Sequence, residues 1–370
     1  MRVEIIQKDT VITDGTARYV DQLQQGLAQK DIVVSTTIPR LPGLVRTSLN
    51  VIRRLGPDIQ SFLKNYPLAV SQADADLYHI PAQTMATLLH TKRFHAPVVV
   101  TVLDIIPYLV RDNPELNSFR HSVDERFYKW ALSALQKADH LLAISHYTRQ
   151  TLIDTLGIAP DKITVTHLAV DPERFSQTDV PEDFYQRYGL QRDSAQYLLY
   201  VGSDDPRKNL KALIRALKHI RHERDDVVLL KVGHSYFSQQ HQRIQALINE
   251  LSLSTHIRFV EHVPDGDLRL FYNAASLLVM PSLYEGFGFP VIESMMCGTP
   301  AIASRASSLP ELVPNETMLF DPEDPKTIAD LVLKLLDNPG NAQAYINWAQ
   351  QFSVESTIMN TKRVYDRLLL

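Results

Sequence analysis

The sequence predicts an α/β protein of two doubly wound, Rossmann-like domains, each with a parallel sheet between helices. Short β-rich runs alternate with longer amphipathic stretches along the chain, the pattern of parallel strands joined by helical crossovers. The 370 residues suffice for two domains that each bury a core. The polar, proline-containing gap Ser176–Glu182 separates two series of such runs, so we place the domain boundary there.

These runs give the candidate strands in chain order. In the first half they are Val3–Ile6, Ile32–Thr36, Leu77–Ile80, Val98–Val102, His140–Ile144 and Ile163–Thr166. In the second half they are Tyr197–Val201, Val227–Val232, Ile257–Val260, Leu277–Met280 and Ala301–Ala303. We therefore expect residues 1–176 to form the first domain and residues 177–351 the second.

The segment Glu285–Glu293 carries the strongest chemical signal. Glu285 begins a glycine-rich turn directly after an apolar run that ends at Pro281. Pro290 suits a first helical position and Gly298 a helix end, so Glu293 is predicted near the first turn of a short helix.

Backbone donors are expected to converge between these two carboxylates. They are the N–H groups of Gly286, Phe287 and Gly288, together with the positive end of the following helix. Such donors bind phosphate, whereas carboxylates accept hydrogen bonds from hydroxyls. The segment therefore suits a sugar nucleotide. The alternative is a strand-turn-helix unit whose two acids face solvent.

A second cluster follows the run that ends at Val201. Gly202 permits close approach of a ligand to the backbone, and Arg207 and Lys208 stand just before a helix predicted from Leu210. Two cations at a strand's carboxyl end beside a helix start form an anion site. The competing interpretation is an exposed basic turn.

Composition restricts the class of protein. Cys297 is the single cysteine, which excludes an intrachain disulfide and fits a reducing, cytoplasmic compartment. Glu4 interrupts any signal-peptide core, and no apolar run approaches the length of a membrane span. The formal net charge of −4 argues against nucleic acid as a partner. The histidines show no metal-ligand spacing, so no metal site is predicted.

These motifs resemble those of the family 4 retaining glycosyltransferases. In that family an acid pair encloses a Gly-Phe-Gly turn, as Glu285 and Glu293 do here, and the following helix ends in a motif similar to Cys297–Pro300. The segments Asp14–Tyr19, Ala138–Ser145, Leu168–Phe175 and Tyr200–Asn209 extend the resemblance in the family's order.

The resemblance implies a GT-B fold, with two Rossmann-like domains facing a cleft and the nucleotide mainly on the second domain. Residues 352–370 would return to pack on the first domain. The activity would move a hexosyl group from a nucleoside-diphosphate sugar to an acceptor hydroxyl with retention, without a divalent metal or other cofactor. Glu293 would bind the ribose, Glu285 the sugar, and Arg207 and Lys208 the diphosphate.

Two first-domain positions enter only through this resemblance. Gly15 stands where relatives carry a Gly-Gly pair that faces the donor phosphates and the acceptor. Leu103 replaces a histidine common in relatives, which makes the neighbouring Asp104 the candidate contact to acceptor or sugar. A strand-end residue with no such role is the alternative for Asp104.

Donor and acceptor are less defined by the sequence. The stretch Glu285–Ser308 resembles mannosyltransferases of surface polysaccharide biosynthesis, which favours GDP-mannose over a UDP-hexose, with a glycan or lipid-linked acceptor. A nucleotide-sugar epimerase, a phosphorylase or a non-catalytic sensor on the same fold remains open. Residues 38–66 combine five cations with one acid among apolar residues, so either peripheral contact with the inner face of a membrane or a solvated helix is expected.

Overall fold

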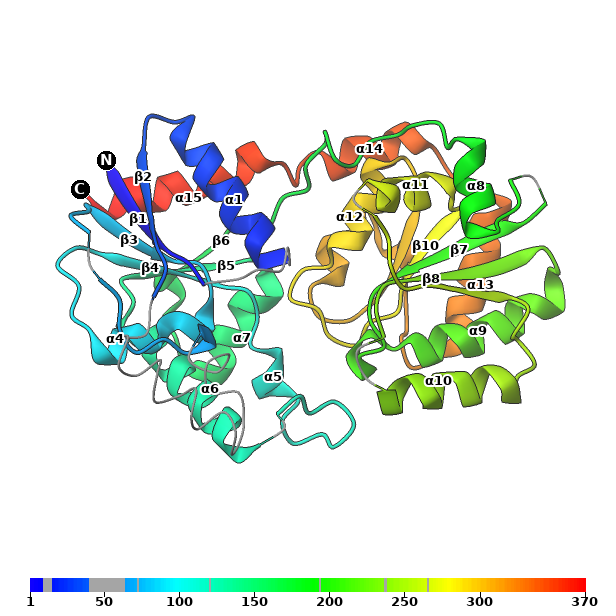
Figure 1. Ribbon diagram of the computed structural model, residues 1–370, viewed down its shortest axis with the longest axis horizontal. Helices are drawn as coiled ribbons and strands as arrows, with labels where there is room; N and C mark the ends of the chain where they lie inside the picture. The colour runs from blue at the N-terminus through cyan, green and yellow to red at the C-terminus, as the bar shows by residue number, and fades with distance from the viewer. Residues whose placement is uncertain are drawn as a thin grey trace. The chain divides into compact units, whose positions relative to one another are not determined.

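The chain forms two compact α/β units (Figure 1). The computed structural model describes residues 1–8, 15–39, 64–71, 73–119, 121–192, 194–235, 238–264 and 266–370. The first unit comprises Met1–Ala169 with Val354–Leu370, and the second comprises Val170–Ser353. Each contains a parallel sheet of six strands with helices packed around it. The predicted α/β class with two doubly wound domains is confirmed.

The first sheet has the order β2-β1-β3-β4-β5-β6. Its strands are β1 Arg2–Ile6, β2 Val33–Thr37, β3 Leu77–Ile80, β4 Val98–Val102, β5 His140–Ala143 and β6 Ile163–Val165. Every residue of β3, β4 and β5 is buried. Continuous apolar runs such as Val98–Val102 form these central strands because helices cover both faces of a parallel sheet.

The second sheet has the order β12-β11-β10-β7-β8-β9. Its strands are β7 Gln196–Val201, β8 Val227–Val232, β9 Ile257–Val260, β10 Leu277–Met280, β11 Ala301–Ser304 and β12 Leu319–Phe320. All strands predicted from the sequence are present, with ends within about one residue of the prediction. The two-residue strand β12 is too short to give a pattern and was not predicted.

Helices connect the strands in both units. The first unit has α1 Gly15–Ala28, α4 Leu88–Thr91, α5 Ile106–Leu109, α6 Ser122–Ala134, α7 His146–Leu156 and α15 Val354–Leu368. The second unit has α8 Glu182–Tyr188, α9 Leu210–Glu223, α10 Ser238–Glu250, α11 Asp267–Ala274, α12 Phe289–Met296, α13 Pro325–Asp337 and α14 Ala342–Ala349. In α9, apolar residues three and four apart, Leu210 to Ile220, are buried and pack beside α13.

The C-terminal helix α15 belongs to the first unit and lies beside α1 (Figure 1). A buried polar network fixes it there. The Tyr365 hydroxyl lies 2.6 Å from His79 Nδ1, and Thr101 Oγ1 lies 2.7 Å from His79 Nε2. Tyr19 on α1 joins the network through Thr101 at 2.9 Å. Burial lowers the pKa of His79 to about 3, so the ring is neutral near pH 7.

This network predicts an acid-sensitive first unit. The pKa of His79 falls from 6.5 to about 3 on folding, so the unfolded chain binds more protons between these values. Stability that is full above pH 6.5 should therefore decline towards pH 3, with His79 contributing at most about 1.4 kcal/mol per pH unit.

The measurement is urea unfolding across this pH range in a Trp348→Phe background. The chain has two tryptophans, so Trp130 on α6 then reports the first unit alone. His79→Gln should reduce the slope of the unfolding free energy against pH, by up to the amount that corresponds to one bound proton. Equal slopes with and without His79 would contradict the assignment, and His140, whose pKa burial lowers to about 4, contributes to both proteins alike.

Candidate functional site

Both sequence motifs of the second unit lie at the carboxyl ends of two neighbouring central strands. Strands β7 and β10 are neighbours, and the strand order reverses between them. In doubly wound sheets, loops diverge at such a switch point and leave a crevice outside the strands' carboxyl ends. The basic motif follows β7 at Gly202, and the acid pair begins after β10 at Glu285. The fold thus brings the two motifs to the place where this architecture binds ligands.

An ion pair joins the two motifs. Lys208 Nζ lies 2.6 Å from Glu285 Oε1, and Ser282 Oγ donates to the same oxygen at 2.8 Å. The Lys208 and Glu285 side chains are only 22% and 12% exposed, so water screens the attraction weakly. The backbone N–H of Leu283 also donates to the Arg207 carbonyl at 2.7 Å. A cation and an acid that the sequence places far apart thus form one local unit.

Arg207 is oriented by an acid in its own turn. Asp205 accepts from the Arg207 backbone N–H at 2.9 Å and from its Nη2 at 2.8 Å. Asn209 then adopts a left-handed conformation with φ of 54° and donates to the carbonyls of Pro281 and Pro322 at 3.1 and 2.8 Å. These contacts fix the short 3-10 helix Pro206–Lys208 against the loop that follows β10.

Two serines after β11 shape the glycine-rich turn. Ser307 Oγ accepts from the Glu285 N–H at 2.9 Å, and Ser308 Oγ donates to the carbonyls of Glu285 and Phe287 at 2.9 and 2.7 Å. Gly288 has φ of 120°, and a Cβ there would lie 2.7 Å from the Leu309 side chain, so only glycine fits. The turn is therefore rigidly held before α12 begins.

The ring of Phe287 does not line an open site. It is 3% exposed and packs edge-on against Phe289 and Phe352. A ligand at this turn would therefore meet backbone, as at Gly286 and Gly288. In the part of the chain that the structure describes, neither of these two N–H groups has a protein acceptor.

Glu293 is a buried acid. It is the fifth residue of α12, which begins at Phe289, and so lies near the first turn as the sequence predicts. The residue is 2% exposed, and the hydroxyl of the buried Tyr272 donates to Oε2 at 2.6 Å. A buried carboxylate requires such partners, so Tyr272 orients Glu293. Tyr272 was not predicted as a site residue, although it lies on the buried face of an amphipathic helix, α11.

A cavity of about 320 Å³ lies within the second unit, and the predicted charged residues are not among those that line it. Its walls come from the carboxyl ends of β7 and β8, the segment after β9 and the start of α11, together with two residues before α8. They are Val201, Gly202, Ser203, Val232, Gly233, His234, Glu261, Val263, Pro264, Gly266, Leu268, Arg269, Arg174 and Phe175. The Phe175 ring contacts the ring of Tyr272, the partner of Glu293, with centroids 5.8 Å apart. Gly202 thus borders the cavity on one side and leads to the cation turn on the other.

The first unit contains the other two candidate residues. Gly15 is the first residue of α1, and Asp14, with which the predicted segment Asp14–Tyr19 begins, lies outside the described residues. Asp104 is half-buried after β4 and accepts from the Ile106 N–H at 2.9 Å, which forms the turn into α5. Most of the basic segment at 38–66, namely residues 40–63, also falls outside the described ranges.

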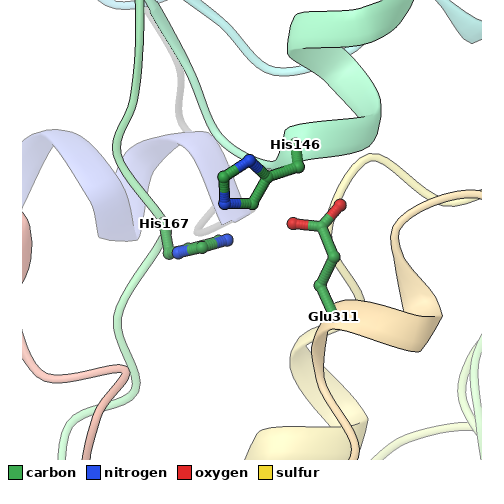
Figure 2. A group of neighbouring side chains, drawn as sticks. All are labelled: His146, His167 and Glu311. Atoms are coloured by element: carbon green, nitrogen blue, oxygen red, sulfur yellow. The ribbon is translucent and has the colours of Figure 1, made fainter.

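Two histidines of the first unit lie close together. Their rings, His146 and His167, have centroids 5.5 Å apart (Figure 2). Glu311, drawn with them, belongs to the second unit. Within either unit taken alone, the described residues contain no group of three or more His, Cys, Asp or Glu ligand atoms near one another. Among those residues no helix has the length and apolar character needed to cross a bilayer.

Two family models match the chain. "Glycosyl transferases group 1" matches residues 183–352, and "Glycosyltransferase Family 4" matches residues 13–174. Together they cover both units except for short end segments and the link between them. The chain therefore belongs to the family 4 glycosyltransferases, and its two α/β units have the GT-B fold.

Bacterial mannosyltransferases are among the similar proteins. O-antigen chain mannosyltransferase B of Escherichia coli is 31% identical over 241 residues, which is 64% of this chain and 62% of that protein. The chain thus spans less than two thirds of that relative. MMP alpha-(1->4)-mannosyltransferase of Mycolicibacterium hassiacum is 25% identical over 355 residues, 90% of this chain and 82% of that protein. Sucrose-phosphate synthase from Thermosynechococcus elongatus shares the fold, with a TM-score of 0.76 and 20% identity over 99% of this chain and 98% of that one.

Proposed function

We propose that the protein is a retaining hexosyltransferase that uses a nucleoside-diphosphate sugar and glycosylates a hydroxyl of a glycan or lipid-linked acceptor. The observation that carries this proposal is the Lys208–Glu285 ion pair at the switch point of the second sheet. It combines a cation for the diphosphate with a carboxylate for sugar hydroxyls, beside a cavity large enough to take a nucleoside. Family membership supports the same reaction class.

In this proposal each group of the second unit has one task. The ammonium of Lys208 and the guanidinium of Arg207 bind the diphosphate, Glu293 accepts from the ribose hydroxyls, and Glu285 accepts from a sugar hydroxyl. As the bond from C1 to the phosphate oxygen breaks, negative charge grows on the diphosphate. The two cations stabilise that charge more strongly in the transition state than in the ground state.

Retention follows from a front-face route. Glu285 is engaged by Lys208 and Ser282, and Glu293 is buried under Tyr272, so neither carboxylate suits a covalent nucleophile. The acceptor oxygen instead bonds to C1 on the face that the diphosphate leaves. The proton of the acceptor hydroxyl passes to an oxygen of the departing phosphate, which balances the step without a further base. The first unit, with Gly15 and Asp104, would supply phosphate and acceptor contacts.

A guanine nucleotide is the favoured donor, as GDP-mannose. The two mannosyltransferase relatives favour mannose as the sugar of the donor. Glu261 lines the cavity and is exposed, and its carboxylate favours guanine as the base. A carboxylate can accept from both N1–H and N2–H of guanine, whereas uracil offers one N–H between two carbonyl oxygens that repel it. UDP-hexose is the second choice.

Reaction class is tested by the products. With GDP-mannose and acceptor, released GDP should match transferred mannose, and little GDP should form without acceptor. Activity should persist in EDTA, because Arg207 and Lys208 carry the diphosphate charge. Acceptor-independent nucleotide turnover would indicate an epimerase or phosphorylase, and binding without turnover a sensor. Complete loss in EDTA, restored by Mg²⁺ or Mn²⁺, would contradict the metal-independent route.

Base preference is tested by thermal shift. GDP at about 100 times its dissociation constant should stabilise the protein by about 2.7 kcal/mol, and UDP at the same concentration by less. Glu261→Gln should reduce the difference in stabilisation between GDP and UDP, because the glutamine amide presents an N–H donor where guanine needs an acceptor. A larger stabilisation by UDP in the wild type would refute the guanine assignment while leaving the transferase assignment intact.

The two acids should separate binding from turnover. Glu293→Ala should raise the donor dissociation constant, because it removes a ribose contact, whereas Glu285→Ala should lower kcat more than affinity. Isothermal titration and initial rates measure the two effects. Wild-type affinity and turnover in both variants would remove these residues from the donor site.

The cation turn should give the largest loss. Charge-assisted hydrogen bonds from Arg207 and Lys208 to the diphosphate are worth roughly 1.5–3 kcal/mol each. Their joint removal should reduce kcat/KM by about 10² to 10⁴, and more through kcat than through donor affinity. Lys208→Ala and Glu285→Ala should be non-additive, since each breaks the same ion pair. A folded Arg207→Ala/Lys208→Ala protein within about tenfold of wild type would show that this turn does not hold the leaving group.

A further inference from the structure

A second ion pair lies behind the cavity and is fully buried. Lys231, in β8, is 0% exposed, and Asp204, in the loop after β7, is 1% exposed. Lys231 Nζ lies 2.9 Å from Asp204 Oδ1. Removing two charges from water is costly, and a well-packed apolar pair often stabilises a fold equally well or better. Stability alone therefore gives no reason for an ion pair at this place.

The ion pair extends into a directional network. Lys231 Nζ also donates to the Gly233 carbonyl at 2.6 Å and approaches Ser235 Oγ at 3.4 Å. His241 Nδ1, from α10, lies 3.0 Å from Asp204 Oδ2. Burial opposes the charged form of Asp204, but the hydrogen bonds from Lys231 and His241 outweigh it, so the pKa of Asp204 is lowered. The carboxylate is thus ionised and held from two sides.

The two loops that Lys231 connects form adjacent walls of the cavity. Gly202 and Ser203 line it from the β7 side, and Gly233 and His234 from the β8 side. The backbones of the two loops approach closely. A Cβ at Gly233, whose φ is 125°, would lie only 2.8 Å from the Gly202 carbonyl oxygen. Lys231 therefore sets how these walls meet.

The same network reaches the cation turn. Asp204 precedes Asp205, which orients Arg207 through its backbone N–H and its guanidinium. A shift of Asp204 would move Asp205 and hence Arg207. One buried ammonium is thus connected both to the walls of the cavity and, through Asp204 and Asp205, to a cation proposed to bind the diphosphate.

We propose that Lys231 is a positioning residue for the nucleotide donor: paired with Asp204, it fixes the loops after β7 and β8 in the arrangement that binds the nucleoside and diphosphate. This inference rests on the proposed function. It assigns to the ion pair a role in donor affinity that is separable from its role in stability.

The test separates these two roles with a charge-free pair. Lys231→Met alone should unfold more easily, because it leaves the buried Asp204 without its cation. Asp204→Leu/Lys231→Met removes both charges and should recover wild-type thermal stability. The double variant should still bind GDP at least tenfold more weakly, because methionine cannot donate to the Gly233 carbonyl. With donor sugar, KM should rise because the loops that bind the nucleoside are displaced. The value of kcat should fall as well, because Arg207 moves away from the diphosphate whose charge it stabilises in the transition state.

A matched control lies before the same strand. Arg224 Nη2 pairs with Asp226 Oδ2 at 2.9 Å just ahead of β8, at the amino end of the strand rather than beside the cavity. Asp226→Leu/Arg224→Met likewise replaces an ion pair by two apolar residues there and should leave GDP affinity unchanged.

Three outcomes would overturn the inference. Wild-type GDP affinity in the stable Asp204→Leu/Lys231→Met protein would show that the ion pair is structural only. An equal loss of affinity in the Asp226→Leu/Arg224→Met control would show that the effect is general. A wild-type protein that binds neither GDP nor UDP would refute the proposed function and this inference with it, which distinguishes that failure from the first two.

Discussion

The candidate site of the second unit is organised around one contact, the ion pair between Lys208 and Glu285. It connects the loop after β7 to the loop after β10, the two central strands between which the sheet order reverses. Around it, Asn209 and Ser308 fix the same loops through backbone carbonyls, so the groups are held before any ligand arrives. Preorganised charge of this kind stabilises a developing anion without the cost of reorganisation. An incoming diphosphate would then share Lys208 with Glu285.

Much of the fold could be predicted because parallel strands in doubly wound sheets are continuous apolar runs. Val98–Val102 and Leu277–Met280 are strands with the predicted bounds, and both are buried throughout. β12 has only two residues and takes its strand identity from pairing with β11, which no local pattern reveals. Helix α12 begins at Phe289, one residue before the predicted start at Pro290, and Glu293 lies near its first turn as expected.

The candidate site, like the fold, could be predicted only in part. Sequence spacing placed Glu285, Glu293, Arg207 and Lys208 near a sheet edge, because strand ends and helix starts are local features. It did not reveal that Lys208 and Glu285 pair, or that Tyr272 and Asp205 orient their neighbours, because those contacts depend on three-dimensional packing. One clue was present in the sequence: Lys231 interrupts the apolar run Val227–Val232, and a charge inside a central strand requires a buried partner.

The most direct measurement of the central claim is a crystal structure of the protein with bound GDP. The account predicts the diphosphate against Lys208 and Arg207, the ribose hydroxyls on Glu293, and the base in the cavity bordered by Gly202, Gly233 and Glu261. A diphosphate bound elsewhere, with the Lys208–Glu285 pair untouched, would contradict it.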